Sequence, residues 1–426
     1  MRQINFVRWF YTVSLYLLIP LIILRLLWRG LRAPAYWQRW SERFGFISPL
    51  PQPHSLWIHA VSMGEVQAAI PLIQTLYSRF PHYPILVTTM TPTGSQRVKA
   101  IFADQVWHVY LPYDLPDAIA RFLGRTQPQL LILLETELWP NLLRACQQRL
   151  IPVILINARL SAQSAARYQH IAGFMRPLLT SLVAIAAQTQ VDANRFMELG
   201  VPATQIQVTG NIKFDSRSPS HYVTQAKQLR HQCGNQRVIW IAASTHEGEE
   251  KLVLEAFSQL RVEINALLLI LVPRHPERFN RVAQLCQQHG YLISRRSQNE
   301  PCTAMTDIYL GDTMGELPLL YAASDVAFVG GSLVPIGGHN LLEPAAAGLP
   351  IIVGTYVFEC EEICRQLLAE QAGQQVQNTE QLVQAAKCYL TNANLRQQAG
   401  EQGRWFVEKN QGALERALSM IYAYIK

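Results

Sequence analysis

At 426 residues the chain is longer than one hydrophobic core usually serves, and its 49% content of hydrophobic residues suffices for two compact domains. The net charge of +7 is not gathered in a long Lys and Arg run, and no RNA-recognition or zinc signature is present, so we expect no nucleic-acid partner. None of the seven cysteines belongs to a C-x-x-C motif, which favours reduced thiols in the cytoplasm.

The first element in chain order is an apolar segment near the N-terminus. Residues 9–24 carry no charge, and the apolar character resumes after Arg25 as far as Trp28. A helix over residues 9–28 would be about 30 Å long, roughly the thickness of a bilayer's hydrocarbon core. More arginines follow the segment than precede it, so the positive-inside rule keeps the bulk of the chain in the cytoplasm. We predict an uncleaved, single-pass signal anchor; because Pro20 and Arg25 weaken a spanning helix, the alternative is a helix lying in the membrane interface.

Residues 34–45 extend the predicted anchor with a mixture of Trp, Tyr and Arg. Such a mixture settles at the level of the lipid headgroups. Together with the positive net charge, it predicts that the protein works beside an anionic membrane surface.

The rest of the chain alternates short apolar runs with longer amphipathic stretches. A first series of runs covers residues 57–61, 85–89, 106–111, 130–134, 153–156, 183–187 and 206–209. A second series covers residues 238–242, 267–272, 308–310, 326–329 and 351–353. Residues 215–220, rich in Ser, separate the two series as a plausible linker. The pattern predicts an α/β fold of two Rossmann-like, doubly wound parallel-sheet domains that face each other across a cleft.

The residues after the first predicted strand offer a candidate catalytic carboxylate. The segment from Ser55 to Gln67 reads as an apolar strand, a turn of small residues and a helix start that carries Glu65. Open α/β sheets place their chemistry at this end of the strand. A helix N-terminus favours the ionised carboxylate and burial opposes it, so Glu65 could be tuned as a general base. The alternative is that Glu65 only complements the dipole of its helix.

The densest motif lies in the second series, from Phe328 to Pro350 (FVGGSLVPIGGHNLLEPAAAGLP). It predicts a strand, a glycine-rich loop and a helix starting near Asn340. Glycines let a ligand approach the backbone, and the amides at a helix N-terminus suit a phosphate. Glu343 could then bind ribose hydroxyls, although a tight turn from strand to helix would explain the glycines equally well.

Eight motifs together carry a family resemblance. They are WIHAVSMGE (57–65), TTMTPTG (88–94), ETELWPN (135–141), NARLS (157–161), GNIKFD (210–215), ASTHEGE (243–249), PRHPER (273–278) and GGHNLLEP (337–344). In this order they resemble the 3-deoxy-D-manno-octulosonic acid (Kdo) transferases of lipopolysaccharide synthesis, the lipid IVA Kdo transferases of the GT-B class. The resemblance runs from the N-terminal segment to about Pro350, no motif departs from the family pattern, and only the Gln-rich C-terminal region is undiagnostic.

This resemblance implies an inverting glycosyltransferase that moves Kdo from CMP-Kdo to a membrane-embedded lipid A precursor, lipid IVA, on the cytoplasmic side of the bacterial inner membrane. It also implies the domain order. An anchor over 1–33 precedes an acceptor-binding domain over 34–215 and a CMP-sugar-binding domain over 216–400, and by analogy with other GT-B enzymes a C-terminal helix over 401–426 could pack back on the first domain.

The resemblance also assigns three catalytic residues. Glu65 matches the family's general base, which takes the proton of the attacking sugar hydroxyl. Glu135 and Lys213 match residues that stabilise the transition state, and Lys213 could offset charge on the leaving CMP phosphate or on the donor carboxylate. The alternative for these two is a structural ion pair. If the strand continues beyond Glu135, Glu137 should point to the opposite face, so only one of these two carboxylates would face the cleft.

For the nucleotide, three segments match the family's CMP-contacting residues. They are Pro273 and Arg274; Met314, Gly315 and Glu316; and Asn340, Leu341, Leu342 and Glu343. Arg274 suits the phosphate because a guanidinium can donate two parallel hydrogen bonds. Although His275 and His339 lie near these segments, no carboxylate or Cys stands at ligand spacing, so we expect neither a metal nor another cofactor.

Two functions from other classes remain as alternatives. A GT-B-like sugar-nucleotide epimerase could share the two-sheet fold and the Glu-Pro turn, but it would have no use for a bilayer-length anchor. A non-catalytic, two-lobed sugar-binding or lipid-binding protein would more naturally carry a cleavable export signal. The number of Kdo units added, the acyl pattern of the acceptor and the oligomeric state do not follow from the sequence.

Overall fold

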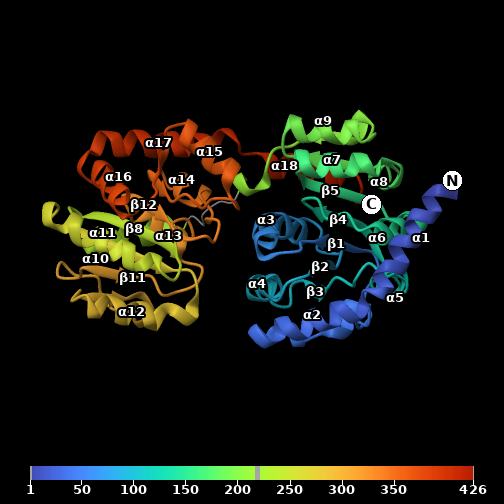
Figure 1. Ribbon diagram of the computed structural model, residues 1–426, viewed down its shortest axis with the longest axis horizontal. Helices are drawn as coiled ribbons and strands as arrows, with labels where there is room; N and C mark the ends of the chain where they lie inside the picture. Colours follow the sequence, from blue (N-terminus) through green and yellow to red (C-terminus); the bar gives the residue numbers. More distant parts are fainter. Residues whose placement is uncertain (1, 216–220, 426) are drawn as a thin grey trace. The chain divides into compact units, whose positions relative to one another are not determined.

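The computed structural model describes residues 2–215 and 221–425, which form two compact units (Figure 1). One unit contains the described residues up to 215 together with 411–425, and the other contains 221–410. Apart from Asp215, the linker predicted over 215–220 lies outside the described residues.

The first unit is built on a seven-stranded parallel sheet with the order β3-β2-β1-β4-β5-β6-β7. Its strands are β1 (Ser55–His59), β2 (Ile85–Thr89), β3 (Trp107–Tyr110), β4 (Pro128–Leu134), β5 (Val153–Ala158), β6 (Ala184–Ala187) and β7 (Ile206–Val208). The helices of this unit that follow its strands are α3 (Met63–Arg79), α4 (Pro92–Phe102), α5 (Pro116–Thr126), α6 (Pro140–Gln148), α7 (Ala162–His170), α8 (Ala172–Leu179) and α9 (Gln190–Glu198). All seven runs of the first predicted series are strands, which confirms this part of the prediction.

The second unit repeats the design with the strand order β10-β11-β9-β8-β12-β13-β14, again all parallel. Its strands are β8 (Val238–Thr245), β9 (Leu267–Pro273), β10 (Ile293–Arg295), β11 (Ile308–Leu310), β12 (Val326–Val329), β13 (Ile351–Val353) and β14 (Gly373–Gln375). Its helices are α10 (His221–Cys233), α11 (Glu249–Glu263), α12 (Phe279–Gln288), α13 (Leu317–Ala322), α14 (Leu342–Ala346), α15 (Glu361–Ala369), α16 (Thr379–Thr391) and α17 (Ala393–Lys409). The two parallel sheets of the predicted fold are thus confirmed.

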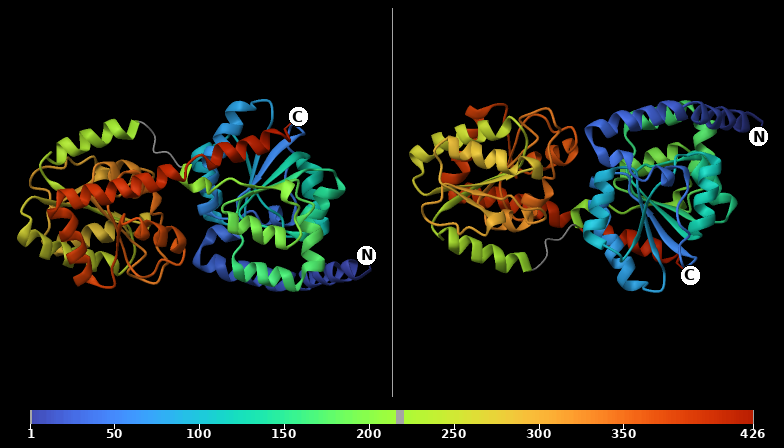
Figure 2. Two further views of the ribbon diagram at one scale, coloured as in Figure 1. Left: turned by 90° about the horizontal axis from the view of Figure 1, so that it is seen from above. Right: turned by 90° about the horizontal axis from the view of Figure 1, so that it is seen from below.

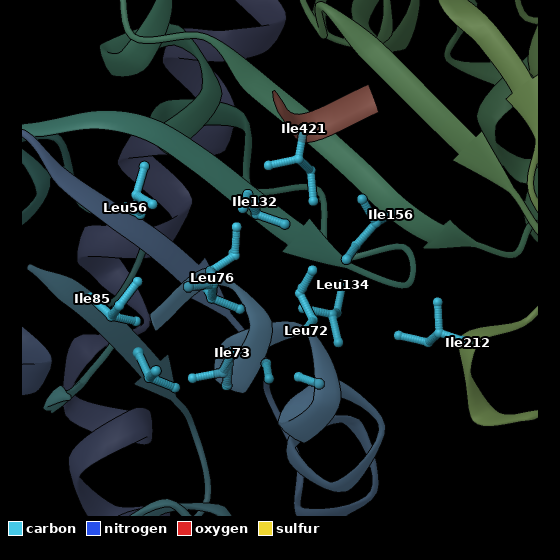
Figure 3. Close-up of a cluster of buried hydrophobic side chains, with 14 of the residues drawn as sticks. Leu56, Leu72, Ile73, Leu76, Ile85, Ile132, Leu134, Ile156, Ile212 and Ile421 are labelled. Atoms are coloured by element: carbon cyan, nitrogen blue, oxygen red, sulfur yellow. The ribbon is translucent and has the colours of Figure 1, made fainter. Parts of the chain in front are cut away.

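The end of the chain contributes to the core of the first unit. Figure 3 shows Ile421 of α18 (Ala413–Tyr422) beside Ile132 and Ile156 of the central strands, and all three side chains are fully buried. Asp215 holds the start of this helix, because its carboxylate accepts hydrogen bonds from the N–H groups of Gly412 (2.6 Å) and Leu414 (2.7 Å). The segment predicted as one helix over 401–426 therefore comprises the end of α17, in the second unit, and α18, in the first.

Two helices precede the first strand, α1 (Arg2–Leu17) and α2 (Ile19–Arg32), and α1 runs along the surface of the first unit beside α5 and α8 (Figure 2). In the described chain no single helix is long and apolar enough to cross a membrane. The two helices meet the criteria of length and composition only as a pair bent by 46°. A membrane-spanning anchor is therefore not confirmed.

Hydrogen bonds fasten α1 to this unit. The hydroxyl of Tyr11 donates to Asp114 (2.9 Å) and that of Tyr16 donates to Asp117 (2.5 Å). Asp114 is itself 2% exposed and accepts the first N–H groups of α6, so Tyr11 binds a carboxylate that is already part of the fold. One side of α1 is thus held by polar contacts with the folded unit.

Candidate functional site

A capping box fixes Glu65 at the N-terminus of α3. Ser62 Oγ accepts the Glu65 backbone N–H (3.4 Å), while Glu65 Oε1 accepts the backbone N–H (3.2 Å) and the hydroxyl (2.9 Å) of Ser62. Glu65 Oε2 accepts the N–H of Val61 (2.9 Å). With an exposed fraction of only 7%, the carboxylate is held in one orientation at the end of β1. Glu65 therefore has a structural role at the start of α3.

The same surroundings raise the pKa of Glu65 to about 7. Burial is the largest cause, and the negative charges of Glu135 and Glu137 add to it, whereas the hydrogen bonds from Val61 and Ser62 lower the pKa. A carboxyl with a pKa near 7 is suited to general base catalysis at neutral pH. Its capping role and a catalytic role are therefore compatible.

Glu135 and Glu137 both raise the pKa of Glu65. If the strand continued beyond Glu135, their side chains would point to opposite faces. β4 ends at Leu134, and Glu135 has a left-handed backbone with φ of 56°, so the alternation of side chains along the strand does not continue. Burial, followed by the charge of Glu135, raises the pKa of Glu137 as well. Three carboxylates therefore lie near one another at the carboxyl ends of β1 and β4.

Lys213 joins this group through an ion pair. It lies in the short helix η4 (Ile212–Asp215), and its Nζ donates to Glu135 Oε1 (2.9 Å). The side chains of Lys213 and Glu135 are 40% and 33% exposed, so the pair is open to a ligand. The structure thus brings Glu65, Glu135 and Lys213 together, and the ion pair that the sequence left as an alternative is present.

In the second unit the predicted nucleotide residues follow three strands. Pro273 ends β9, and the N–H of Arg274 donates to the carbonyl of Thr245 at the end of β8 (3.0 Å). Met314 and Gly315 follow β11, and Glu316 precedes α13. After β12 come Asn340 and Leu341, with Leu342 and Glu343 in α14. All nine residues therefore lie on the carboxyl side of this unit's strands.

Both carboxylates among these nine residues, Glu316 and Glu343, already have partners in the same unit. Glu316 forms a bidentate ion pair with Arg296 (2.7 and 3.0 Å), and this contact is the first cause of its lowered pKa. Glu343 accepts a hydrogen bond from the side-chain amide of Asn340 (3.0 Å). A bound nucleotide would have to share or replace these contacts.

The first backbone amides of the glycine-rich loop already have a partner within the protein. Glu249, which is fully buried in the first turn of α11, accepts the backbone N–H groups of Gly331 (2.7 Å), Ser332 (3.0 Å) and Leu333 (2.9 Å), and also that of His246 (2.9 Å). These loop amides bind a carboxylate of the protein and are not available to a phosphate. The helix expected from Asn340 begins at Leu342 and has only five residues, so it offers no extended helix N-terminus.

Three histidines lie together after β8, β9 and β12. The Nε2 atoms of His246 and His339 are 2.7 Å apart, so one of the two rings donates and the other accepts. The rings of His246 and His275 are 5.1 Å apart. Burial, followed by the charge of Arg274, lowers the pKa of His339 to about 3. Within residues 2–215 and 221–425, no three His, Cys, Asp or Glu side chains are arranged to hold a metal ion.

Two residues of the site region were not found by sequence reasoning. Asn157 lies within the NARLS motif, and its side-chain oxygen accepts the backbone N–H of Ile212, next to Lys213 (3.1 Å). Glu249 lies within the ASTHEGE motif, and three of its four partners lie more than 80 positions later. An Asn after an apolar run and a Glu at a predicted helix start are too common in sequences to single these residues out.

The sequence is similar to those of known proteins over nearly its full length. Residues 38–216 match the family described as 3-deoxy-D-manno-octulosonic-acid transferase (kdotransferase). The 3-deoxy-D-manno-octulosonic acid transferase of Haemophilus influenzae is 44% identical over 422 residues, 98% of this chain and 99% of the relative. The enzyme of the same name from Bordetella pertussis is 36% identical over 425 residues, covering 96% of this chain and 98% of the relative.

Among solved structures, a glycosyltransferase from Rickettsia africae superposes with a TM-score of 0.53 at 14% sequence identity, covering 88% of this chain and all of that one. At this level of identity the likeness concerns the fold alone, and it fits the GT-B class that the motifs imply. The sequence identities carry the stronger conclusion, because they extend over nearly the full length of both chains. The chain belongs to the 3-deoxy-D-manno-octulosonic acid transferase family.

Proposed function

We propose that the protein transfers Kdo from CMP-Kdo to a lipid A precursor, lipid IVA, in lipopolysaccharide core biosynthesis. The observation that carries this proposal is the 44% identity over 98% of the chain to a relative named as a Kdo transferase. The epimerase and the non-catalytic binding protein are not favoured, because relatives that match nearly the whole chain are named as Kdo transferases. Transfer of labelled Kdo to the purified precursor tests the proposal.

In the proposed reaction Glu65 is the general base. As the acceptor hydroxyl oxygen attacks the anomeric carbon of Kdo, its proton passes to the Glu65 carboxylate, the bond from that carbon to the CMP phosphate breaks, and CMP leaves with the electron pair. Attack from the opposite face inverts the anomeric centre. The pKa of about 7 supports this role because it leaves a large fraction of Glu65 ionised at neutral pH.

The Glu135–Lys213 pair is proposed to stabilise the transition state. Lys213 Nζ carries a positive charge that can offset negative charge on the leaving phosphate or on the Kdo carboxylate. Glu135 holds Nζ at 2.9 Å, and it can also face the oxocarbenium-like centre. Both side chains are partly exposed, which supports a role in contact with a substrate.

Arg274 is proposed to bind the CMP phosphate, and its replacement tests the donor site. Arg274→Lys keeps the charge but loses the planar fork, so KM for CMP-Kdo should rise by about 10- to 100-fold with a smaller change in kcat. The matched control is Arg281→Lys, which alters an exposed arginine paired with Glu247 in the same unit. Steady-state kinetics with varied CMP-Kdo, and inhibition by CMP, measure the effect. Equal KM values for the two variants would contradict the assignment of Arg274.

The reaction is proposed to need no metal ion. Lys213 and Arg274 supply positive charge for the phosphate and carboxylate groups of the donor, which is the task that a divalent cation performs in other transferases. This expectation is tested with a chelator in the transfer assay.

We also propose that α1 and α2 hold the protein on the cytoplasmic face of the bacterial inner membrane by lying in the interface. Large apolar side chains of these helices are exposed, among them Leu17 (75%), Leu21 (61%) and Leu31 (72%). The bend of 46° and the hydrogen bonds of Tyr11 and Tyr16 to the folded unit support a helix pair that lies on the membrane. Such a surface would place the protein beside its lipid acceptor.

Vesicle flotation tests the membrane proposal. The double variant Leu17→Glu with Leu21→Glu should lower binding to anionic vesicles by at least about tenfold, because each buried leucine contributes roughly 1.5–3 kcal/mol. The control carries Leu150→Glu with Val262→Glu, two side chains that are 89% and 81% exposed elsewhere. If the first variant floats like the control, this face is not the membrane surface.

A further inference from the structure

Asn157 lies in a bulge of β5 beside the ion pair. β5 and β6 pair at Leu155 with Ile185 and next at Ala158 with Ala187, so β5 contains one residue more than its partner there. Asn157 is fully buried and has a left-handed backbone with φ of 53°. Bulges often redirect a side chain next to an active site. Asn157 is therefore a candidate for a residue with a specific task.

The bulge holds both partners of the ion pair through two consecutive residues. The carbonyl of Ile156 accepts the backbone N–H of Glu135 (3.0 Å). The side-chain oxygen of Asn157 accepts the backbone N–H of Ile212 (3.1 Å), directly before Lys213. These two hydrogen bonds therefore help to set the position of Nζ relative to the Glu135 carboxylate.

The remaining contacts of Asn157 set its orientation. Its carbonyl accepts a hydrogen bond from the side-chain amide of Gln188 (2.9 Å). Its Nδ2 is buried and finds no acceptor in the part of the chain that the structure describes. A buried donor without a partner is unfavourable, so stability alone does not account for an amide side chain at this point.

We propose that Asn157 is a positioning residue, which holds η4 so that Lys213 meets Glu135 in the geometry needed for transfer. This inference rests on the proposed function, since it concerns how Lys213 acts. The structural alternative is that Asn157 only occupies a left-handed backbone position, which Asn tolerates better than most residues. Glycine tolerates the same backbone without a side-chain acceptor, so Asn157→Gly separates the two roles.

The experiment is a double-mutant cycle between Asn157→Gly and Lys213→Met, with kcat and KM for CMP-Kdo, the melting temperature and CMP binding measured for each variant. Asn157→Gly should lower kcat by about tenfold, the effect of losing roughly one hydrogen bond, and change KM by less than about twofold. In the Lys213→Met background the same change should have no further effect on kcat, because a residue that acts through Lys213 has nothing left to position. The control Asn299→Gly, at an exposed residue with φ of 54°, should leave kcat unchanged.

Several outcomes would overturn the inference. If Asn157→Gly leaves kcat unchanged, or if its effect adds to that of Lys213→Met, Asn157 does not act through Lys213. If Lys213→Met itself leaves kcat unchanged, the proposed role of Lys213 fails and the inference fails with it. Should the glycine variant not fold, Asn157→Asp keeps the acceptor oxygen for Ile212. A kcat more than tenfold below wild type in a folded aspartate variant would also contradict the inference.

Discussion

Glu65→Gln is expected to lower kcat for Kdo transfer by about 10² to 10⁴, the usual contribution of a general base. The substitution keeps the capping box, because Gln also serves at the third helical position of such a box. The bonds between Ser62 and residue 65 at the start of α3 can therefore remain, whereas the N–H of Val61 loses the oxygen that accepts it, so the free energy of unfolding should fall by about 1–3 kcal/mol. What is lost is the group that accepts the proton.

The pH dependence of Kdo transfer gives a second test of Glu65 as the general base. Because the base must be ionised, kcat/KM should fall as the pH drops below the Glu65 pKa of about 7 and level off above it. Ser62→Ala removes a hydrogen bond that lowers this pKa, so the midpoint should move to higher pH. Glu137→Gln removes a charge that raises it, so the midpoint should move to lower pH. Unchanged transfer by folded Glu65→Gln would leave Glu65 with its capping role alone.

Glu249→Gln should strongly destabilise the second unit. Each Glu249 oxygen accepts two backbone N–H groups, so an NH₂ group in place of one oxygen leaves two buried donors unpaired. At about 1–3 kcal/mol for each unpaired donor, the free energy of unfolding should fall by roughly 2–6 kcal/mol. That is a large share of the total stability of most domains, about 5–15 kcal/mol.

Urea unfolding followed by hydrogen exchange measures this effect. The amides of Gly331, Ser332 and Leu333 should lose protection in the variant before the strands do. Glu255→Gln, an exposed residue of the same helix, is the control and should change the free energy by less than about 0.5 kcal/mol. If Glu249→Gln unfolds at the same urea concentration as this control, the carboxylate does not hold the loop.

The two sheets could be predicted from the sequence, because parallel strands that are covered on both faces appear as continuous apolar runs. The two strands that were missed, β10 and β14, are the edges of the second sheet and have three residues each. Their sequences, Ile293–Arg295 and Gly373–Gln375, contain too few apolar residues to form such a run. Hydrophobic patterning does not report edge strands as short and polar as these, although it did report β3 and β7, the edges of the first sheet.

The candidate site was predictable where its chemistry is local. Ser62 and Glu65 have the spacing of a capping box, and the family motifs pointed to Glu135 and Lys213. The hydrogen bond from Ile212 in η4 to Asn157 joins residues that are 55 positions apart. The bonds from the glycine-rich loop to Glu249 span more than 80 positions. A local sequence pattern cannot predict contacts over such separations. For the same reason the binding of three loop amides by Glu249 could not be predicted.

For the N-terminus the sequence leaves two placements open. Hydropathy and length favour a spanning helix, and both are properties of the segment alone. The hydrogen bond from Tyr11 to Asp114, a carboxylate buried in the first unit, depends on the fold, and it is what favours an interfacial helix pair. A cysteine introduced as Val7→Cys and an impermeant maleimide would separate the two placements. In vesicles with the catalytic units outside, an interfacial helix reacts at once and a spanning one only after detergent.

The first measurement to make is transfer of labelled Kdo from freshly generated CMP-Kdo to a tetra-acylated lipid A precursor in detergent, using the full-length protein with and without a chelator. We expect a Kdo-bearing lipid in equal amount in both samples. Failure to form this product under conditions where a known Kdo transferase forms it would contradict the assigned donor and acceptor. A product that disappears with the chelator and returns with a divalent cation would instead contradict the metal-independent mechanism.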